Sequence, residues 1–347
     1  MTMFREAAVT CANSLEAGSP TISVALCTRN GAQFIGEQIR SICLQLLLPM
    51  EIVLSDDASH DATVTLARQA VRECAAQGGH SAVTLRVLLN SRALGITRNF
   101  EQAIRACRGE LIVLCDQDDV WKPERLTRMA SEFENRRDLM LLHSDAELID
   151  AAGQSLGRTL FHALGVDPLE LGRIHQGRAF DVLLRRNLVT GATVMMRRSL
   201  LRDALPFPSE WLHDEWLALI AAATGTVDVV ESPLVRYRQH GSNQIGAGRL
   251  SLAAKIRLAF LSRSTRYQVR LAKAVVLEAR LAELSQRVSL SVIEKIHGKV
   301  AHQRFRASLP RSRVWRFPAV LNEALRGRYD EFGQGRYNVI RDLLEPA

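Results

Sequence analysis

The sequence predicts an α/β fold in which a mostly parallel sheet is covered by helices on both faces. Three observations predict this class. Short apolar runs recur in the first third of the chain, segments with helical spacing separate them, and polar residues follow the runs. Strands that alternate with helices form parallel sheets whose two faces are both buried. Because ligands of such sheets bind beyond the carboxyl ends of the strands, we expect the site there.

Four apolar runs are the expected strands: Ile22–Cys27, Glu51–Leu54, Thr84–Leu89 and Leu111–Cys115. Apolar residues at helical spacing predict helices between them: Phe34–Leu46, Asp61–Cys74 and Thr97–Cys107. The stretch Ser59–Asp61 offers an N-terminal cap for the second helix, because short polar side chains accept hydrogen bonds from the first turn.

The tetrapeptide Asp116–Asp119 directly follows the last predicted strand and holds three carboxylates. Like charges this close raise each other's pKa values unless a cation lies between them. A divalent ion held by one or two carboxylates and by substrate phosphates meets that need, and a solvated acidic turn is the alternative. Since polar clusters also follow two other strands, at Thr28–Gly31 and Ser55–Asp57, we expect a nucleotide pocket.

Two common nucleotide-binding motifs are absent. The sequence has no G-x-x-x-x-G-K-[ST], and no G-x-G-x-x-G follows the first strand. Neutralisation of a diphosphate would therefore fall to a metal ion at the fourth strand.

Seven motifs, in this order and spacing, resemble the inverting glycosyltransferases of family 2. They are Thr28–Gly31, Ser55–Asp61, Leu94–Phe100, Asp116–Trp121, Gly191–Thr193, His213–Trp216 and Tyr237–Asn243. The chain looks most like the bacterial rhamnosyltransferases that assemble O-antigen and other surface polysaccharides. The resemblance implies a GT-A fold and a metal-dependent, inverting transfer from a nucleotide-diphosphate sugar.

The resemblance also implies contacts to the nucleotide sugar. Asp57 matches the carboxylate that pairs with the base, and Thr28, Arg29 and Asn30 line the same pocket. Arg98, in the third motif, is a further expected contact. Arg29 departs from the pattern, because many relatives carry an aromatic residue there. A guanidinium can also lie flat on a base.

The expected contacts to ribose, diphosphate and metal lie at the acidic cluster. Asp118 and Asp119 resemble the ribose and metal contacts, with Mg²⁺ or Mn²⁺ as the ion, and Asp116 supports them. His240 is a candidate third contact, because neutral imidazole is a common metal ligand.

Asp214 resembles the catalytic base, which takes a proton from the acceptor hydroxyl as that hydroxyl attacks the anomeric carbon. Glu215 is the alternate, because sequence alone does not separate adjacent carboxylates. A structural alternative is that either acid favours the positive end of the helix expected over Leu217–Ala223.

Four larger side chains are weaker candidates. Trp121 and Trp216 could contact the sugar or the acceptor, although burial in the core is the commoner fate of tryptophan. Arg236 and Arg238 could reach the diphosphate through fork-shaped hydrogen bonds, and a solvated basic loop explains them almost as well.

The whole chain has 347 residues, 47% of them hydrophobic, which predicts one large domain with an extension. We expect a tail over residues 1–20, a GT-A domain over 21–248 and a basic helical region over 249–347. No signal peptide or membrane span is expected. The six cysteines form no C-x-x-C pair, and Cys27, Cys43 and Cys115 lie in apolar contexts. A reducing cytoplasm therefore suits the chain better than zinc binding or disulfide pairing.

The C-terminal region combines cations with apolar residues. Its expected cations are Arg263, Arg266, Arg270, Lys273, Arg280, Arg304, Arg306, Arg311, Arg313 and Arg316, and aromatic residues are interleaved at Phe305, Trp315 and Phe317. Such a stretch can lie on the inner face of the cytoplasmic membrane, and a solvated basic face is the alternative.

The net charge of +8 would also suit a nucleic-acid partner, but no recognised motif accompanies it, so none is expected. Two alternative functions stay open. A nucleotidyltransferase would need a Gly-rich, basic loop after the first strand, where Arg29 is the one cation up to Gly36. A catalytically inactive GT-A module that binds glycans would be free to lose Asp118, Asp119 or Asp214, and all three are present.

Overall fold

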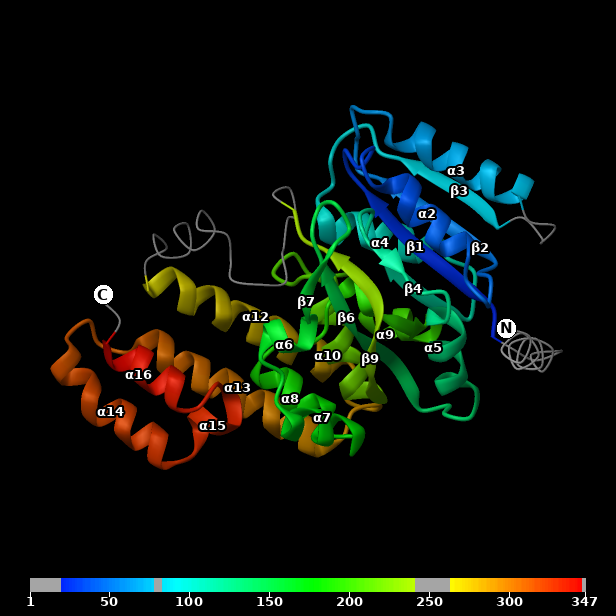
Figure 1. The fold of residues 1–347 in the computed structure, drawn as a ribbon. Helices are drawn as coiled ribbons and strands as arrows, with labels where there is room; N and C mark the ends of the chain where they lie inside the picture. Colours follow the sequence, from blue (N-terminus) through cyan, green and yellow to red (C-terminus); the bar gives the residue numbers. More distant parts are fainter. Residues whose placement is uncertain (1–19, 78–82, 241–262, 345–347) are drawn as a thin grey trace.

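The computed structural model describes residues 20–77, 83–240 and 263–344, built around one nine-stranded sheet with helices on both faces (Figure 1). Eight strands follow the order β3-β2-β1-β4-β8-β6-β9-β5, and β7 pairs with β6. In chain order the strands are β1 Ile22–Thr28, β2 Glu51–Asp56, β3 Thr84–Leu89, β4 Leu111–Cys115, β5 Val120–Trp121, β6 Leu139–Ile149, β7 Ser155–Thr159, β8 Met195–Arg197 and β9 Thr226–Arg238.

The four strands expected from the sequence form a parallel half-sheet. β1 pairs in parallel with β2 and β4, and β2 pairs in parallel with β3. Both faces of β1 are buried, because Val24 and Leu26 enter one apolar core whereas Ala25 and Cys27 enter the other. Successive side chains of a strand point to opposite faces, which explains why a strand buried on both sides reads as an unbroken apolar run. The predicted α/β class is confirmed.

The three predicted helices are present with slightly different ends. α2 (Ile35–Cys43) and α3 (Thr63–Gln77) contribute to the core on one face of the half-sheet, and α4 (Ile96–Ala106) contributes to the core on the other. The expected cap of the second helix is supported, because the Asp61 carboxylate accepts a 3.0 Å hydrogen bond from the backbone N–H of Thr63. The carboxyl ends of β1, β2 and β4 are left free to form a site.

The remaining half of the sheet is mixed, and the sequence pattern did not predict it. β8 is antiparallel to both β4 and β6, β9 is parallel to β6, and β5 is antiparallel to β9. β5 directly follows the acidic tetrapeptide Asp116–Asp119. Its pairing with β9 therefore brings the end of β9 and His240 beside that tetrapeptide.

From residue 263 onward the described chain is helical, as expected. The later helices are α12 Arg263–Glu283, α13 Leu290–Ser308, α14 Arg313–Leu325, α15 Arg328–Phe332 and α16 Arg336–Leu344. The earlier ones outside the half-sheet are α5 Arg125–Glu134, α6 Leu160–Leu164, α7 Pro168–His175, α8 Ala179–Arg185, η1 Gly191–Thr193, η2 Arg198–Leu200, α9 Leu201–Ala204 and α10 His213–Thr224. Figure 1 shows the late helices, in yellow to red, packed as a group against α8 and α10.

The C-terminal helices share an apolar core with the sheet domain. Leu277 of α12 and Ile296 of α13 belong to the same buried cluster as Leu183 of α8 and Trp216 of α10. Ion pairs cross the same boundary, from Arg287 to Asp203, from Lys295 to Asp181 and from Lys273 to Glu215. The helical region is therefore packed against the sheet domain and is not a detached extension.

The expected basic face of this region is only partly exposed. Arg306 is buried and donates two 2.7 Å hydrogen bonds to the Asp342 carboxylate, which also accepts from the hydroxyls of Tyr267 and Tyr329. Arg316 is buried too and donates to the backbone carbonyl of Asp342 at 2.9 Å. For these two cations the predicted surface position is wrong, because each has an acceptor inside the helical region.

Several predictions fall outside the described residues: the tail 1–19, Cys11, the Gly241–Asn243 part of the last motif, the domain boundary after residue 248 and the side chain of Arg263. The five described cysteines are all free, and Cys43 is half-buried, not buried as expected. Within the described part of the chain, no helix has the length and apolar character needed to cross a membrane.

Candidate active site

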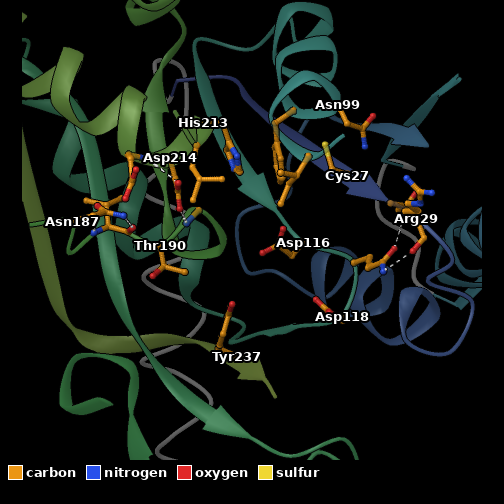
Figure 2. A pocket seen from close by; sticks show the side chains of 18 of the residues that line it. Cys27, Arg29, Asn99, Asp116, Asp118, Asn187, Thr190, His213, Asp214 and Tyr237 are labelled. Atoms are coloured by element: carbon orange, nitrogen blue, oxygen red, sulfur yellow. Dashed lines mark hydrogen bonds between the residues drawn. The ribbon is translucent and has the colours of Figure 1, made fainter. Parts of the chain in front are cut away.

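A pocket of about 310 Å³ opens at the carboxyl ends of β1, β2 and β4, where the fold class predicts a ligand. Figure 2 shows side chains from distant parts of the chain around it: Arg29 follows β1, Asp116 and Asp118 follow β4, and His213 and Asp214 open α10. The full lining of this one cavity includes residues from all seven motifs.

One side of the pocket is formed by the loops after β1 and β2. The Asp57 carboxylate lines it and accepts hydrogen bonds from the backbone N–H groups of Leu94 (2.6 Å) and Gly95 (3.0 Å). The Arg29 guanidinium lies 3.7 Å from the same carboxylate. Thr28 lines the pocket as well, but its hydroxyl donates to Asp56 at 2.8 Å.

Asn30 and Arg98 were expected in this pocket and do not line it. Asn30 has a left-handed backbone (φ 49°), and its N–H and side-chain oxygen bond to Ser59 and His60, so it joins the β1 and β2 loops. Arg98 is half-exposed and pairs with Glu101 at 2.9 Å. Both side chains are engaged elsewhere in this structure, and their contacts to the nucleotide sugar stay predictions.

Of the three clustered carboxylates, Asp116 and Asp118 line the pocket, and Asp119 does not. Burial, followed by the negative charges of Asp118 and Asp214, raises the pKa of Asp116 to about 7. In the described part of the chain, no Lys or Arg side chain forms a salt bridge with Asp116 or Asp118. The pocket therefore carries an excess of negative charge that the described side chains do not neutralise.

Asp119 is 2% exposed, and its Oδ1 accepts a hydrogen bond from the backbone N–H of Arg238 (3.0 Å). Burial and the neighbouring Asp118 and Asp116 carboxylates raise its pKa well above the usual range. These contacts place Asp119 below the pocket surface, tying β9 to the end of β4. Its Oδ2 is buried without a hydrogen-bond partner among the described residues, and its assignment as a metal ligand stays a prediction.

The two arginines of β9 also have partners inside the protein. Arg238 is buried, donates to the backbone carbonyl of Asp118 at 2.7 Å and pairs with Glu37 at 2.6 Å. Arg236 donates to the carbonyl of Gly153 at 2.6 Å. Neither lines the pocket, so their suggested contact with a diphosphate is not supported. Arg238 instead fixes the backbone that presents Asp118.

His240 lies against Asp118, as the metal prediction requires. Its Nε2 is 2.8 Å from Asp118 Oδ2, and its ring packs on Phe34 with centroids 4.8 Å apart. A carboxylate and an imidazole in contact are a suitable donor pair for a divalent ion. Across the described residues no three such side chains are gathered as a complete metal site, so further ligands would have to come from phosphate or water.

Asp214 lines the opposite side of the pocket, in the first turn of α10. Its Oδ2 accepts a hydrogen bond from Gly191 N–H (3.0 Å) and its Oδ1 from Glu215 N–H (2.8 Å). A Cβ atom at Gly191 would lie 3.0 Å from His213 Nε2, so glycine permits this close approach. Glu215 also lines the pocket, but its carboxylate accepts a 2.6 Å hydrogen bond from Lys273. Of these two candidate bases, Asp214 is the one without a cationic partner among the described residues.

His213 lines the pocket although sequence reasoning gave it no role. It is 4% exposed, and its ring stacks on Phe100 with centroids 3.9 Å apart. Neither ring nitrogen has a hydrogen-bond partner among the described residues, and burial lowers its pKa, so the ring is neutral. The available signal was its place directly before the candidate base. Asn187, Thr190 and Tyr237 also line the pocket without having been expected there.

The two tryptophans suggested as sugar contacts belong to the core. Trp216 is 1% exposed, and its indole N–H donates to the carbonyl of Ala204 at 2.7 Å. Trp121 is buried with the Arg125 guanidinium 3.9 Å above its ring. Neither lines the pocket, and both predictions are corrected by this burial.

Residues 23–205, more than half of the chain, match the family model described as Glycosyl transferase family 2. An uncharacterized protein of Mycobacterium tuberculosis is 25% identical over 224 residues, which is 63% of this chain and 59% of that protein. An uncharacterized glycosyltransferase of Nostoc sp. is 25% identical over 228 residues, covering 64% of this chain and 66% of its own length. The chain therefore spans less than two thirds of these relatives.

Among solved structures, a similar fold is found in residues 1–349 of S. aureus TarS, crystallised in complex with UDP-GlcNAc. The TM-score is 0.56 at 17% sequence identity, covering 88% of this chain and 80% of that one. A second crystal structure of S. aureus TarS gives a TM-score of 0.53 at 18% identity, covering 90% of this chain and 54% of that one. The likeness supports the shared fold.

Proposed function

This chain belongs to glycosyltransferase family 2, and on that premise we propose that it moves a sugar from a nucleotide-diphosphate donor to an acceptor hydroxyl. The observation that carries the proposal is the meeting of Asp57, Asp118 and Asp214 around one pocket. These carboxylates come from three distant segments. They supply a contact to the nucleobase, a metal ligand and a general base, which are the functions that such a transfer needs.

We assign the nucleotide to the side of the pocket formed by the β1 and β2 loops. Two backbone N–H groups fix the Asp57 carboxylate there, so its position is preorganised to bind the nucleobase. Arg29 lies beside it, with 44% of its side chain exposed. A planar guanidinium can stack on a base, which supports Arg29 in the place where relatives carry an aromatic ring.

Asp118 and His240 are the residues that would hold Mg²⁺ or Mn²⁺. They are already in contact, and the raised pKa of Asp116 indicates a position that favours a cation. Donor phosphates and water would complete the coordination shell, as is usual for Mg²⁺. When bound, the ion supplies positive charge to the leaving diphosphate.

Asp214 is proposed to accept the proton of the acceptor hydroxyl. Each of its oxygens receives one backbone hydrogen bond and keeps lone-pair capacity for a further one. The hydroxyl oxygen forms its bond to the anomeric carbon as the bond to the diphosphate breaks, which inverts the configuration in one displacement. The neutral His213 ring beside Asp214 can bind a sugar hydroxyl.

The finer assignments rest on the sequence resemblance. We propose dTDP-rhamnose as the donor and a cell-surface polysaccharide or lipid-linked glycan as the acceptor, at the inner face of the cytoplasmic membrane. We also retain the division into a tail (1–20), a GT-A domain (21–248) and a helical C-terminal region (249–347).

A peripheral membrane contact is proposed for α14. Val314, Trp315, Phe317, Leu321 and Leu325 are exposed on this helix, Trp315 to 72%, and the exposed Arg311 and Arg313 lie at its start. Aromatic rings settle at headgroup depth, and arginines are attracted to anionic lipid. Replacing Trp315 and Phe317 together by serine should reduce cosedimentation with vesicles containing anionic phospholipid. Unchanged cosedimentation of the folded variant would remove this contact.

A thermal-shift panel tests the enzyme class. It uses dTDP-rhamnose, UDP-glucose, UDP-GlcNAc, GDP-mannose and ATP, each with Mn²⁺ and with EDTA. A ligand that binds the folded state raises its stability. We expect one nucleotide sugar to stabilise the protein with Mn²⁺ and not with EDTA. Asp118→Asn should lose this effect and the exposed control Asp330→Asn should keep it.

Stabilisation by ATP alone would favour a nucleotidyltransferase. No stabilisation by any nucleotide sugar, with Mn²⁺ or without it, would contradict the proposed function and favour a glycan-binding module.

A further inference from the structure

A second pocket, of about 280 Å³, lies where the C-terminal helices meet α8 and α10. Its volume approaches that of small-molecule sites, which run from roughly 300 to 1,000 Å³. Six cationic side chains line it: Arg185, Arg186, Arg270, Lys273, Lys299 and Arg306. Its lining includes a single carboxylate, that of Glu215. This pocket is therefore strongly positive.

Three of these cations already have carboxylate partners. Arg186 pairs with Glu170, Lys273 with Glu215 and Arg306 with Asp342. Their positive charge is largely neutralised within the protein.

The other three cations, Arg185, Arg270 and Lys299, have no carboxylate within salt-bridge distance in the described part of the chain. Lys299 donates to the backbone carbonyls of Leu184 (2.7 Å) and Phe332 (2.6 Å). Arg185 donates to the carbonyl of Gly333 at 3.2 Å. Carbonyl oxygens satisfy donors but bring no full negative charge, so these three side chains have no anionic partner among the described residues.

The mutual repulsion of these cations affects the pKa of Lys299. Burial, followed by the charges of Arg306, Arg270 and Arg185, lowers the pKa of Lys299 to about 7. An anion placed among these side chains would relieve their mutual repulsion.

A neutral polar group lines the same cavity. Gln303 is 3% exposed, and its side-chain Oε1 has no hydrogen-bond partner among the described residues. The oxygen and nitrogen of an amide are assigned from their hydrogen-bond network. Gln303 can therefore present N–H groups to an anion, and a ligand would satisfy a group that is otherwise buried without a partner.

The second pocket adjoins the active site. Asn187 and Glu215 line both pockets, and Glu215 directly follows the proposed base Asp214 in the chain. A molecule anchored in the positive pocket can therefore extend past this shared wall towards Asp214. In the proposed function the diphosphate of the donor binds near Asp118. The positive pocket is therefore available to bind the acceptor.

We propose that this second pocket binds a phosphate or diphosphate group carried by the acceptor; the assignment to the acceptor rests on the proposed function. Phosphate fits because several cations converge, and because Arg forks match its oxygens. The phosphate could belong to a lipid-linked diphosphate or to a phosphodiester within a glycan.

Calorimetric titration with sodium pyrophosphate in EDTA tests the pocket, because EDTA removes the metal on which the donor site depends. We expect saturable binding by the unmodified protein. Arg270→Gln and Arg185→Gln should each raise the Kd about tenfold, the loss of one charge-assisted hydrogen bond. Arg270 is exposed at its position on α12, so its variant should keep the fold, which a thermal melt verifies.

The matched control is Arg304→Gln, which removes an exposed cation from α13 outside the pocket. It should leave the Kd within twofold of the unmodified value, about 0.4 kcal/mol at most. Absence of pyrophosphate binding, or equal weakening by Arg304→Gln and Arg270→Gln, would overturn the proposal.

The source of the phosphate is resolved by titrating farnesyl diphosphate and glycerol 3-phosphate under the same conditions. Tighter binding of farnesyl diphosphate supports a lipid-linked acceptor, and tighter binding of glycerol 3-phosphate supports a phosphodiester glycan. In either case Arg270→Gln must weaken the tighter ligand, and an unchanged Kd would overturn the proposal.

These titrations are independent of the enzyme class. If pyrophosphate binds in EDTA but no nucleotide sugar stabilises the protein with Mn²⁺, the proposed function fails and the phosphate pocket stands.

Discussion

The two adjoining pockets carry opposite charge. The pocket at the strand ends presents Asp116, Asp118 and Asp214, whereas the pocket beneath the C-terminal helices presents Arg185, Arg270 and Lys299. Burying charge without a partner costs stability, and neither pocket supplies enough counter-charge from the described side chains. Our two proposals interpret this difference as a division of roles, with a cation and the donor in the first pocket and an anionic acceptor in the second.

The same contrast appears in two pKa shifts. Burial and the charges of Asp118 and Asp214 raise the pKa of Asp116 to about 7, and burial and three neighbouring arginines lower that of Lys299 to about 7. Crowded like charges explain both directions. Ligands of opposite charge should therefore restore the ordinary ionisation of each group.

The largest expected effect belongs to the acidic pocket. Asp214→Asn should lower kcat about 10²- to 10⁴-fold, the usual contribution of a general base, because the amide cannot take the acceptor's proton. Donor binding in Mn²⁺ should persist, since Asp214 is proposed to act on the acceptor. Single-turnover kinetics and donor titration separate the two quantities. Near-normal turnover by Asp214→Asn would show that another group is the base.

The next effect concerns the wall of the positive pocket. Asp342→Ala should lower the free energy of unfolding by about 3–5 kcal/mol, because Arg306 would stay buried without its carboxylate. Urea denaturation measures this, and the exposed Asp330→Ala should change stability by less than about 0.5 kcal/mol. If both variants changed the free energy of unfolding by similar, small amounts, the Arg306–Asp342 pair would not be needed to stabilise the helices that line the positive pocket.

The acidic pocket should also respond to pH. The pKa of Asp116 is about 7 against an ordinary value of 3.8, so the folded state holds a proton that the unfolded state has released. Stability should therefore fall as pH rises from about 4 to 7, and Asp116→Asn should flatten that slope.

The pH dependence of Mn²⁺ binding is a second way to measure the ionisation of Asp116. Protons and Mn²⁺ compete for this site, so Mn²⁺ affinity should rise between pH 6 and 8, by up to about tenfold per pH unit. Calorimetric titration at several pH values measures it. A pH-independent affinity would contradict the assignment of the cation to this pocket.

A smaller effect is expected from the backbone that holds Asp214. In Gly191→Ala, the new Cβ would lie 3.0 Å from His213 Nε2, so the His213 ring, next to Asp214 in the chain, must shift by a few tenths of an ångström. We expect kcat/KM to fall about tenfold, consistent with misplacement of a catalytic group. Gly172→Ala is the matched control, because nothing lies within 4 Å of its added Cβ. Equal activity of both variants would show that the approach of Gly191 to Asp214 is not needed.

The parallel half-sheet was predictable because its strands are buried on both faces and read as apolar runs. The strands of the other half were missed for physical reasons. β6 contains His143, Ser144 and Asp145 within its buried run, and β8 has only three residues. Their pairing depends on contacts between distant segments, which local pattern does not encode.

At the site, Asp57, Asp116 and Asp118 were expected in one pocket because strand ends converge in this fold, whereas Asp214, at the start of α10, was expected from the family resemblance alone; all four line the pocket. The sequence did not separate Asp118 from Asp119, since adjacent residues of a turn can face the pocket or the core. Trp216 illustrates the same limit. It belongs to a motif whose other residues line the pocket, and the motif does not indicate that Trp216 is buried in the core.

The positive pocket could not be predicted from the sequence. Arg270 and Lys273 were recognised as helical cations, but Arg185 joins them only because α12 and α13 dock on α8.

The most direct test of the two-pocket account is a crossed titration on three proteins: unmodified, Asp118→Asn and Arg270→Gln. Each receives the stabilising nucleotide sugar in Mn²⁺ and, separately, pyrophosphate in EDTA. The account predicts that Asp118→Asn loses the first binding and keeps the second, while Arg270→Gln weakens the second about tenfold and keeps the first. Parallel loss of both ligands in either variant would contradict it, because a single shared site would then bind both.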